Sequence, residues 1–280
     1  MKIIKNPNQL QKICIDLLKK KKTIGLVPTM GALHNGHISL IKKSVSQNDI
    51  TVVSVYVNPI QFGPNEDYNK YPRPIEQDIK ICKDNKVDFL FLPTNEILYG
   101  KNFSTYVFND SLSKIMCGVT RPNHFQGVTT VVSKLFNIVM PDRAYFGLKD
   151  YQQYVIIKQM VSDLNFKTKI IGCPIVREKT GLAMSSRNKY LSTNEALNAS
   201  IISKVLIQAK KEFTAHKPII SIIKDIKNNL SKITDCTVEY IEIREAETLK
   251  EAKENTKNIV IAVAVRINKV RLIDNIVCKK

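Results

Sequence analysis

The feature that most constrains the fold is the repeated alternation of short apolar runs with amphipathic stretches in the first part of the chain. Residues 51–57 and 87–92 are largely apolar and rich in β-branched or aromatic side chains, as is typical of strands buried in a parallel sheet. Residues 33–47 and 74–85 have apolar side chains at helical spacing. This alternation predicts an α/β fold, with a Rossmann-like parallel sheet and helices on both of its faces. Further strands are expected at residues 23–27, 143–146 and 169–176, and further helices at 128–140 and 152–164.

Glycine and proline are distributed unevenly, which predicts a domain boundary. All ten glycines lie between Gly25 and Gly181, and only one of the eleven prolines comes after Pro174. Specialised turns, where binding sites are usually built, should therefore be concentrated in the first part. We predict a nucleotide- and substrate-binding domain at residues 1–176 and a smaller C-terminal α+β lid domain at residues 177–280. Within the lid, helices are expected at 193–213 and 219–230, and strands at 238–243, 259–267 and 270–273.

The composition excludes several classes of protein. Hydrophobic residues make up 44% of the chain, which favours a packed core over disorder. No apolar run approaches the roughly 20 residues that a membrane-spanning helix needs, and the lysine-rich N-terminus does not resemble a secretory signal. The six cysteines are scattered without a C-x-x-C pair. A disulfide framework or zinc site is therefore not expected, and a cytoplasmic location fits best.

The charge leaves two interpretations open. The net charge is +18, with 35 lysines against 8 arginines, and it is spread over both parts of the chain. A nucleic-acid-binding protein more often concentrates its charge and favours arginine. We therefore favour a solvated lysine-rich surface that attracts anionic substrates, while a nucleic-acid-binding protein remains the alternative.

The turn after the strand predicted at residues 23–27 gives the clearest indication of chemistry. Residues 28–37 read Pro-Thr-Met-Gly-Ala-Leu-His-Asn-Gly-His, where a helix N-terminus is suited to hold an anion. His34 and His37, three apart on a helix, should share a face and donate hydrogen bonds to phosphate oxygens. Phosphate would favour the charged imidazolium. Two surface histidines or half a metal site are the alternatives, but Gly31 and Gly36 in this turn favour a nucleotide.

Uncharged amides are expected beside this turn. Asn58 and Gln61 come just after the strand predicted at 51–57, and Gln153 follows the strand at 143–146 after a short loop. Amides can both donate and accept hydrogen bonds, which suits the hydroxyls and carboxylate of a small polar acid. The alternative for Asn58 is a simple Asn-Pro turn.

Two further groups are suited to phosphate. Lys149 offers a point positive charge for a polyphosphate, although it could be an ordinary surface lysine. Ser185, Ser186 and Arg187 lie at the predicted domain junction, where they could hold departing pyrophosphate, or form a flexible linker. Arginine is scarce in this chain, which draws attention to both Arg187 and Arg121.

Together these segments resemble one family. The H-x-G-H after a first strand is similar to the nucleotidylyl-transferase superfamily, and the longer string of residues 28–37 resembles pantoate–β-alanine ligases (pantothenate synthetases). Further strings match in order: residues 57–63 (VNPIQFG), 71–73 (YPR), 149–153 (KDYQQ) and 184–188 (MSSRN), and more loosely 121–128. There are two departures. Leu148 stands where the family usually has an acidic residue, and Asn123 where it commonly has glycine, a position that could need the left-handed conformation.

The resemblance implies roles for individual residues. Pantoate would be held at Gln61 and Gln153, with Gln61 also near β-alanine and Asn58 and Arg121 as further substrate-binding candidates. Asp78 is a weaker candidate for helping to hold Mg²⁺. His37 would be the catalytic residue, assisted by His34 and Lys149. The residues implied to contact ATP are Met30, Gly31, Ala32, Leu33, His34, Asn35, Gly36, His37, Gly147, Leu148, Lys149, Asp150, Val176, Met184, Ser185, Ser186 and Arg187.

The resemblance also implies an activity. It is the ATP- and Mg²⁺-dependent condensation of (R)-pantoate with β-alanine to pantothenate through a pantoyl-adenylate, with release of AMP and pyrophosphate, in a cytoplasmic homodimer that binds neither nucleic acid nor membrane. The nearest alternative is another adenylyltransferase of the same superfamily with a different acceptor.

Overall fold

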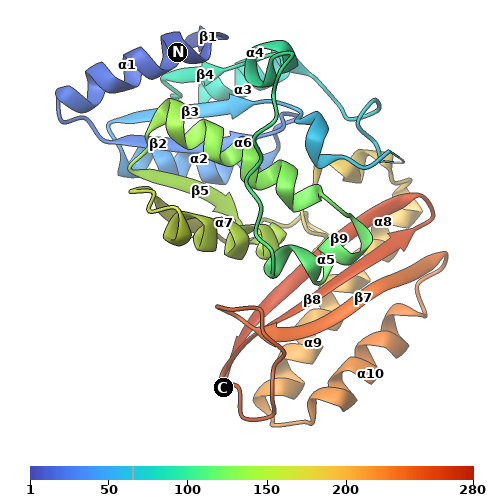
Figure 1. The fold of residues 1–280 in the computed structure, drawn as a ribbon. Coiled ribbons are helices and arrows are strands. Elements are labelled where there is room, and N and C mark those ends of the chain that lie inside the picture. The colour runs from blue at the N-terminus through green and yellow to red at the C-terminus, as the bar shows by residue number, and fades with distance from the viewer. Residues whose placement is uncertain (65) are drawn as a thin grey trace. The chain divides into compact units, whose positions relative to one another are not determined.

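A computed structural model describes residues 1–64 and 66–280 of the chain. The chain divides into two compact units (Figure 1). The first unit comprises Met1–Leu148 and Ile156–Pro174, and the second comprises Lys149–Val155 and Ile175–Lys280. The segment Lys149–Val155 thus belongs with the second unit although its neighbours in sequence belong with the first.

The first unit contains a six-stranded sheet in which every neighbouring pair is parallel, so the predicted parallel sheet is confirmed. The spatial order is β1 (Lys2–Ile4), β4 (Phe89–Phe91), β3 (Ile50–Val55), β2 (Ile24–Thr29), β5 (Arg143–Gly147) and β6 (Lys169–Cys173). From β2 the chain proceeds outward through β3 and β4, then returns to add β5 and β6 on the other side of β2, so the strand order reverses between β2 and β5. In such sheets ligands bind at the carboxyl ends of the strands beside this reversal.

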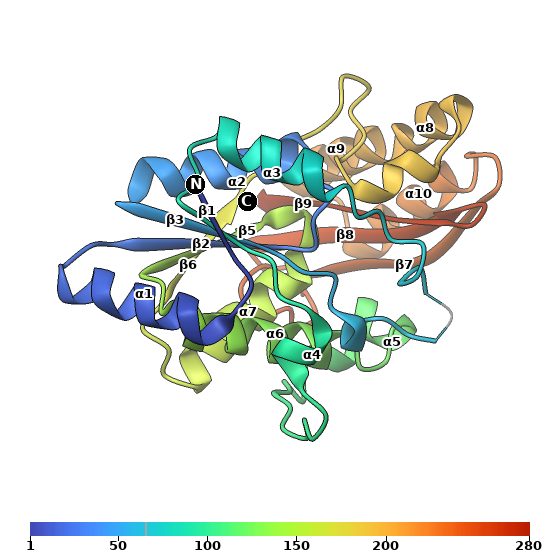
Figure 2. The same cartoon turned by 90° about the horizontal axis from the view of Figure 1, so that it is seen from above.

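Helices cover both faces of this sheet, as predicted (Figure 2). On one face lie α2 (Asn35–Gln47) and α3 (Ile75–Asp84), and on the other lie α1 (Pro7–Lys19), α4 (Asn95–Tyr99) and α6 (His124–Val139). The core under α2 and α3 is apolar because strand residues such as Val27, Val53 and Leu90 are fully buried there with Ile41. The remaining short elements of this unit are the 3-10 helices η1 (Pro59–Gln61), η2 (Leu112–Lys114) and η3 (Leu148–Asp150), which ends in the second unit, and the helix α5 (Cys117–Thr120).

Helix α1 was not predicted, although Asn6 and Pro7 form a helix-start signal in the sequence. The Asn6 side chain accepts hydrogen bonds from the backbone N–H groups of Asn8 and Gln9, and Pro7 occupies the first turn. Asn at the N-cap followed by Pro at the first helical position is a strong helix-start signal. A single buried seam, with Leu10 and Cys14 at helical spacing, then faces the protein.

The second unit is a three-stranded antiparallel sheet with helices, in agreement with the predicted α+β fold. The strands are β7 (Cys236–Glu245), β8 (Asn258–Ile267) and β9 (Val270–Lys279) in that spatial order. β9 is longer than the stretch 270–273 predicted from apolar residues, because two buried polar residues, Asp274 and Asn275, interrupt the pattern without ending the strand.

The helices of the second unit also differ from one prediction. Helix α10 (Ile219–Leu230) was predicted correctly, but the stretch 193–213 forms two helices, α8 (Thr193–Ala199) and α9 (Ile201–Thr214). They meet at Ser200, whose hydroxyl donates to the carbonyl of Leu197. Such a local side-chain bond competes with continuous helix. The 3-10 helix η4 (Ser186–Tyr190) precedes them, and helix α7 (Tyr151–Asp163) has residues in both units. No helix in the described parts of the chain is long and apolar enough to cross a membrane.

Candidate active site

The turn between β2 and α2 has a strained and crowded backbone. Gly31 has φ of 84° and Ala32 has φ of 51°, both in the left-handed region that favours glycine. A Cβ atom on Gly31 would lie 2.8 Å from the Asp78 Oδ2 atom and 2.9 Å from a methyl carbon of Val55. Glycine is therefore required at position 31 for both conformation and space.

A buried carboxylate fixes this turn. Asp78, from α3, is 1% exposed. Its Oδ2 accepts a hydrogen bond from the Ala32 N–H at 2.9 Å, and its Oδ1 accepts one from the Leu33 N–H at 2.7 Å. The structure thus gives Asp78 a positioning role, and its suggested part in binding Mg²⁺ stays a prediction. The N–H groups of Ala32 and Leu33 donate to this carboxylate, so these two amides bond the protein itself.

The two histidines of the turn cap the helix. His34 is the N-cap residue of α2, and its Nδ1 accepts the Gly36 N–H at 3.1 Å. His37 lies three residues later, and its Nδ1 accepts the His34 N–H at 3.3 Å. The ring centroids are 4.1 Å apart. His34 is therefore the N-cap and not a helical residue as predicted, although the two rings lie together as expected.

This reciprocal capping also determines which ring nitrogen carries the proton. An Nδ1 atom that accepts a backbone N–H has no proton of its own, so each neutral ring carries its proton on Nε2. Both Nε2–H groups are then donors suited to a phosphate oxygen. The imidazolium expected beside a bound phosphate stays a prediction.

Gln61 and Asn58 form a buried pair of amides beyond the end of β3. Asn58 Nδ2 donates to Gln61 Oε1 at 3.2 Å and to the Gly127 carbonyl at 3.0 Å. The Tyr99 hydroxyl donates to Asn58 Oδ1 at 2.7 Å, and burial raises the pKa of Tyr99, which keeps this donor protonated. Gln61 Nε2 lies 2.9 Å from the Met30 sulfur. Asn58 thus orients Gln61. A direct contact between Asn58 and substrate stays a prediction.

Arg121, a predicted substrate-binding residue, lies in a network of protein side chains. Its guanidinium makes a paired contact with Glu66, with Nε 2.7 Å from Oε1. One terminal nitrogen lies 3.1 Å from His124 Nε2, and the other lies 3.4 Å from the Gln61 carbonyl oxygen. Its contacts are with residues around Gln61, and a contact with substrate stays a prediction.

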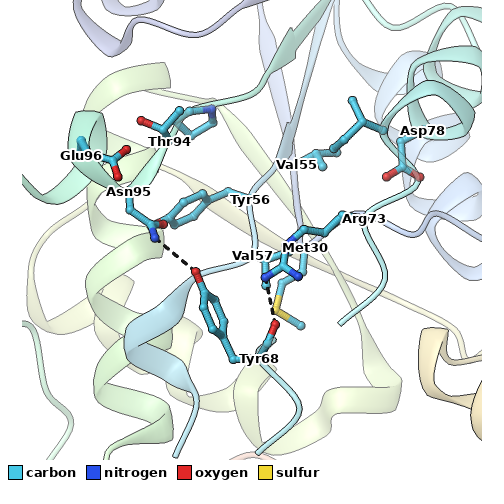
Figure 3. Close-up of a pocket in the computed structure, with 12 residues that line it drawn as sticks. Met30, Val55, Tyr56, Val57, Tyr68, Arg73, Asp78, Thr94, Asn95 and Glu96 are labelled. Atoms are coloured by element: carbon cyan, nitrogen blue, oxygen red, sulfur yellow. Dashed lines mark hydrogen bonds between the residues drawn. The ribbon is translucent and has the colours of Figure 1, made fainter. Parts of the chain in front are cut away.

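A pocket of about 300 Å³ adjoins Met30 beyond the ends of β3 and β4 (Figure 3). Its polar side chains bond one another. The Tyr56 hydroxyl donates to Asn95 Oδ1 at 2.8 Å, and Asn95 Nδ2 donates to the Tyr68 hydroxyl oxygen at 3.2 Å. Arg73 lies over the Tyr68 ring and donates to the Tyr68 carbonyl. The pocket therefore has a rigid polar rim, and apolar walls supplied by residues such as Met30.

In the second unit, the predicted phosphate-binding Lys149 is held through its backbone. The Asn275 side chain, from β9, donates from Nδ2 to the Lys149 carbonyl at 2.9 Å. The Lys149 side chain is 19% exposed, and its Nζ lies 3.7 Å from Asp150 Oδ1. Its charge is thus available near the surface, while its Cα is fixed.

The segment that contains Ser185, Ser186 and Arg187 follows a short hairpin. An isolated bridge joins Arg177 to Ala183, and the Met184 N–H donates to the Val176 carbonyl at 2.9 Å. Ser185 then caps η4, because its hydroxyl accepts the Arg187 N–H at 3.3 Å.

A buried acid of β9 anchors the same hairpin. The Arg177 guanidinium donates to both oxygens of Asp274, at 2.6 and 3.0 Å, and Asp274 Oδ1 accepts the Asn275 N–H at 2.8 Å. Arg177 also donates to the Gly181 carbonyl at 3.1 Å. Asp274 and Asn275 thus connect Lys149 and the hairpin before Ser185 to the same strand.

Comparison with known proteins now decides the family. A family model described as pantoate-beta-alanine ligase matches residues 2–277. The chain belongs to the pantoate-beta-alanine ligase family. It is 53% identical to the pantothenate synthetase of Endomicrobium trichonymphae over 280 residues, covering 100% of this chain and 99% of that protein, and 51% identical to that of Sulfurihydrogenibium sp. (strain YO3AOP1), covering 99% of each.

Solved structures agree with this assignment. A crystal structure of the enzyme from Thermus thermophilus has a TM-score of 0.94 at 38% identity, covering 99% of each chain. A Francisella tularensis pantoate-beta-alanine ligase, described as complexed with beta-gamma ATP and beta-alanine, has a TM-score of 0.81 at 40% identity, covering 99% of this chain and 97% of that one.

Within this ligase fold, the predicted site residues are distributed over both units. Residues 30–37 with Asn58, Gln61, Arg121, Gly147 and Leu148 lie in the first unit. In that unit Gln61 contacts both Met30 and Arg121. The second unit holds Lys149, Asp150, Gln153, Val176 and Met184 to Arg187. Their ligand contacts remain predictions.

Two residues that contact the backbone of Gln61, His124 and Gly127, were not predicted as part of the site. Both lie in the 121–128 string that resembled the family, but only Arg121 was assigned a role. A signal was present, since a histidine and a glycine at the start of a strongly apolar helix are unusual and suggest a close contact with another backbone. Asn123 has φ of 65°, which confirms the expected left-handed conformation.

Proposed function

We propose that this chain condenses (R)-pantoate with β-alanine to form pantothenate, with cleavage of ATP to AMP and pyrophosphate through a pantoyl-adenylate. The observation that carries the proposal is the match to the ligase family over residues 2–277. Relatives named pantothenate synthetase support it, since they are 53% and 51% identical and are covered to 99% of their length. The relative described with an ATP analogue and beta-alanine supports these two substrates.

In the proposed first step, the pantoate carboxylate attacks the α-phosphorus of ATP and pyrophosphate leaves. His34 and His37 would donate from Nε2 to phosphate oxygens, while Gln61 and Gln153 would hold pantoate. Lys149, Ser185, Ser186 and Arg187 would donate to the polyphosphate. Such fixed donors stabilise the charge that develops in the transition state.

In the second step, the β-alanine amine attacks the acyl carbon of the adenylate and AMP leaves. Neither step needs a covalent enzyme intermediate. The buried cysteines are poor nucleophiles, since burial raises the pKa of Cys14 and of Cys82 to about 12. Catalysis would then rest on holding the reactants in line and on electrostatic stabilisation.

Mg²⁺, a cytoplasmic location and a homodimer are further parts of the proposal. Among the described residues, no cluster of three or more His, Cys, Asp or Glu side chains could hold a metal. This agrees with the usual behaviour of Mg²⁺, which binds through one or two carboxylates and substrate phosphates. Mg²⁺ would neutralise phosphate charge, and Asp78 is the candidate carboxylate in the first unit.

Exchange of labelled pyrophosphate into ATP tests the proposed function. We expect exchange that depends on pantoate and proceeds without β-alanine, followed by formation of pantothenate and AMP when β-alanine is added. Exchange driven by a different acid, with none from pantoate, would assign the chain to another adenylyltransferase. Steeply salt-dependent nucleic-acid binding without ATP turnover would support the nucleic-acid alternative.

A further inference from the structure

The backbone of Gln61 packs directly against the first turns of α6. A Cβ atom added to Gly127 would lie 2.6 Å from both the amide nitrogen and the Cα atom of Gln61, and 2.6 Å from the carbonyl carbon of Ile60. No real Cβ atom has such contacts, so the absence of a side chain at position 127 allows the two backbones to meet. The position of Gln61 is thus set by α6.

His124, at the start of α6, holds the Gln61 carbonyl. The residue is 9% exposed, and its Nδ1 lies 2.8 Å from the Gln61 carbonyl oxygen. Its Nε2 lies 3.1 Å from a terminal nitrogen of Arg121. Because a guanidinium only donates hydrogen bonds, Nε2 must accept, and the ring proton must be on Nδ1. His124 therefore donates from Nδ1 to the Gln61 carbonyl oxygen.

The charges around this ring support that tautomer. Arg121 is itself oriented by its paired contact with Glu66, so the guanidinium faces the imidazole in a fixed direction. Protonation of Nε2 would set a second positive charge against Arg121 and remove the acceptor. The Phe125 ring packs edge-on at 4.9 Å between centroids and adds no charge.

The side chain of Gln61 is held at its other end. Asn58 Nδ2 donates to both Gln61 Oε1 and the Gly127 carbonyl. Since Oε1 accepts from Asn58, the Gln61 Nε2 group is turned toward Met30. The backbone of Gln61 is thus held by α6 directly, and its side chain is held by Asn58, which is itself bonded to α6.

We propose that His124 is a positioning residue for Gln61, with Arg121 fixing the imidazole tautomer that makes this possible. The inference rests on the proposed role of Gln61 in binding pantoate. A displaced carbonyl would rotate η1 and misdirect the Gln61 amide, so the loss should be seen in pantoate binding rather than in ATP binding.

Two variants of nearly the same shape separate this role from simple packing. His124→Asn places an amide N–H where Nδ1 stands, so it can still donate to Gln61. His124→Leu has the same branched outline and no donor. In pantoate-dependent pyrophosphate exchange, we expect the KM for pantoate to rise about tenfold in H124L and less than about threefold in H124N, with the KM for ATP unchanged. A tenfold change corresponds to about 1.4 kcal/mol, the scale of one hydrogen bond.

Two controls complete the experiment. Thr129→Val removes a buried hydroxyl one turn further along α6, which contacts the Val107 and Phe125 carbonyls, and should lower the melting temperature without changing the KM for pantoate. Gln61→Ala tests the underlying assignment. An unchanged KM for pantoate in Q61A would refute the role proposed for Gln61 itself. If Q61A raises this KM and H124L matches H124N, only the positioning role is refuted.

The tautomer can be tested without any variant. Long-range ¹H–¹⁵N NMR spectra of the wild-type protein distinguish imidazoles protonated on Nδ1 from those protonated on Nε2. We expect His124 to be protonated on Nδ1 and His34 and His37 on Nε2. An Nε2-protonated His124 would overturn the proposal even if H124L does not fold.

Discussion

The two units hold their predicted ligand-binding groups in different ways. In the first unit, groups far apart in sequence fix the backbone from the interior: the carboxylate of Asp78 holds the turn at Ala32, and His124 holds Gln61. In the second unit, Asp274 and Asn275 also anchor the hairpin before Ser185 and the Lys149 carbonyl, but the Lys149 side chain itself is partly exposed. The difference suggests that the small acid needs amides fixed in advance, whereas phosphates can be met by positive charges that remain hydrated until ATP binds.

The largest expected effect separates the two functions of His37 within the first unit. His37→Ala removes both the helix cap and the Nε2–H donor. His37→Gln keeps a side chain that can cap, since glutamine at this position often accepts the N-cap N–H. Both variants should lose about 10²–10³ in pyrophosphate exchange, the usual cost of one preorganised donor.

Stability should distinguish this pair. Urea unfolding should show H37A about 1 kcal/mol less stable than wild type, the usual cost of a lost cap, and H37Q closer to wild type. Near-normal pyrophosphate exchange in either variant would show that His37 is not a catalytic residue of the proposed mechanism.

The second effect tests whether the buried carboxylate of Asp78 holds the turn at Ala32 and Leu33. In Asp78→Asn, an NH₂ group faces one of the two backbone N–H groups at Ala32 and Leu33, so a buried donor loses its acceptor. We expect a loss of about 1–3 kcal/mol in the free energy of unfolding. The same strain should slow exchange by about tenfold or more, roughly in proportion.

A matched variant on the same helix makes that result specific. Glu76→Gln, on the exposed side of α3, changes charge by the same amount and should leave stability and exchange near wild type. If D78N unfolds at the same urea concentration as wild type, the turn is not held by this carboxylate, and its Mg²⁺ role becomes the better explanation.

The fold of both units could be predicted because its signals are local. Apolar runs and helical spacing gave the strands and helices, and the turn at residues 28–37 gave the expected place for a nucleotide from its position after a strand. The contacts that fix this turn could not be predicted, because the partner of Ala32 is Asp78, and their meeting depends on how α3 packs. Similarly, the spacing of His34 and His37 indicates proximity, but not that both Nδ1 atoms would be used for capping.

Buried polar residues account for the other failures. Asp274 and Asn275 broke the apolar pattern from which β9 was predicted, so its second half was missed. They are tolerated inside the strand because Arg177 and the Lys149 carbonyl satisfy them. The contact of Arg121 with Glu66 could not be predicted either, because the scarcity of arginine in the chain carries no information about its partner.

The third effect concerns the second unit, where chemistry and stability should separate. Arg187→Lys keeps the positive charge but loses the planar fork that suits phosphate oxygens. We expect the KM for ATP to rise about tenfold, equivalent to about 1.4 kcal/mol, with a change in melting temperature much smaller than that of D78N. A large loss of stability in R187K would mean that the second unit is locked like the first.

The smallest expected effect concerns the hydrogen bond that Asn275 donates to the Lys149 carbonyl in the second unit. Asn275→Ala removes the hydrogen bond to the Lys149 carbonyl, and one such bond contributes about 1 kcal/mol. If Lys149 binds the polyphosphate, the KM for ATP should rise about threefold to fivefold, while the KM for pantoate stays constant. Asn268→Ala, in the exposed turn between β8 and β9, is the control and should change neither.

The direction of the Asn275→Ala effect is what sharpens the comparison. A backbone anchor behind a partly exposed lysine restricts where the charge can reach without holding the ammonium itself, so its loss should weaken ATP binding only slightly. A loss as large as that of H37A would show that Lys149 is as tightly preorganised as the first turn. No change in this KM would show that Lys149 reaches the phosphates without the hydrogen bond from Asn275.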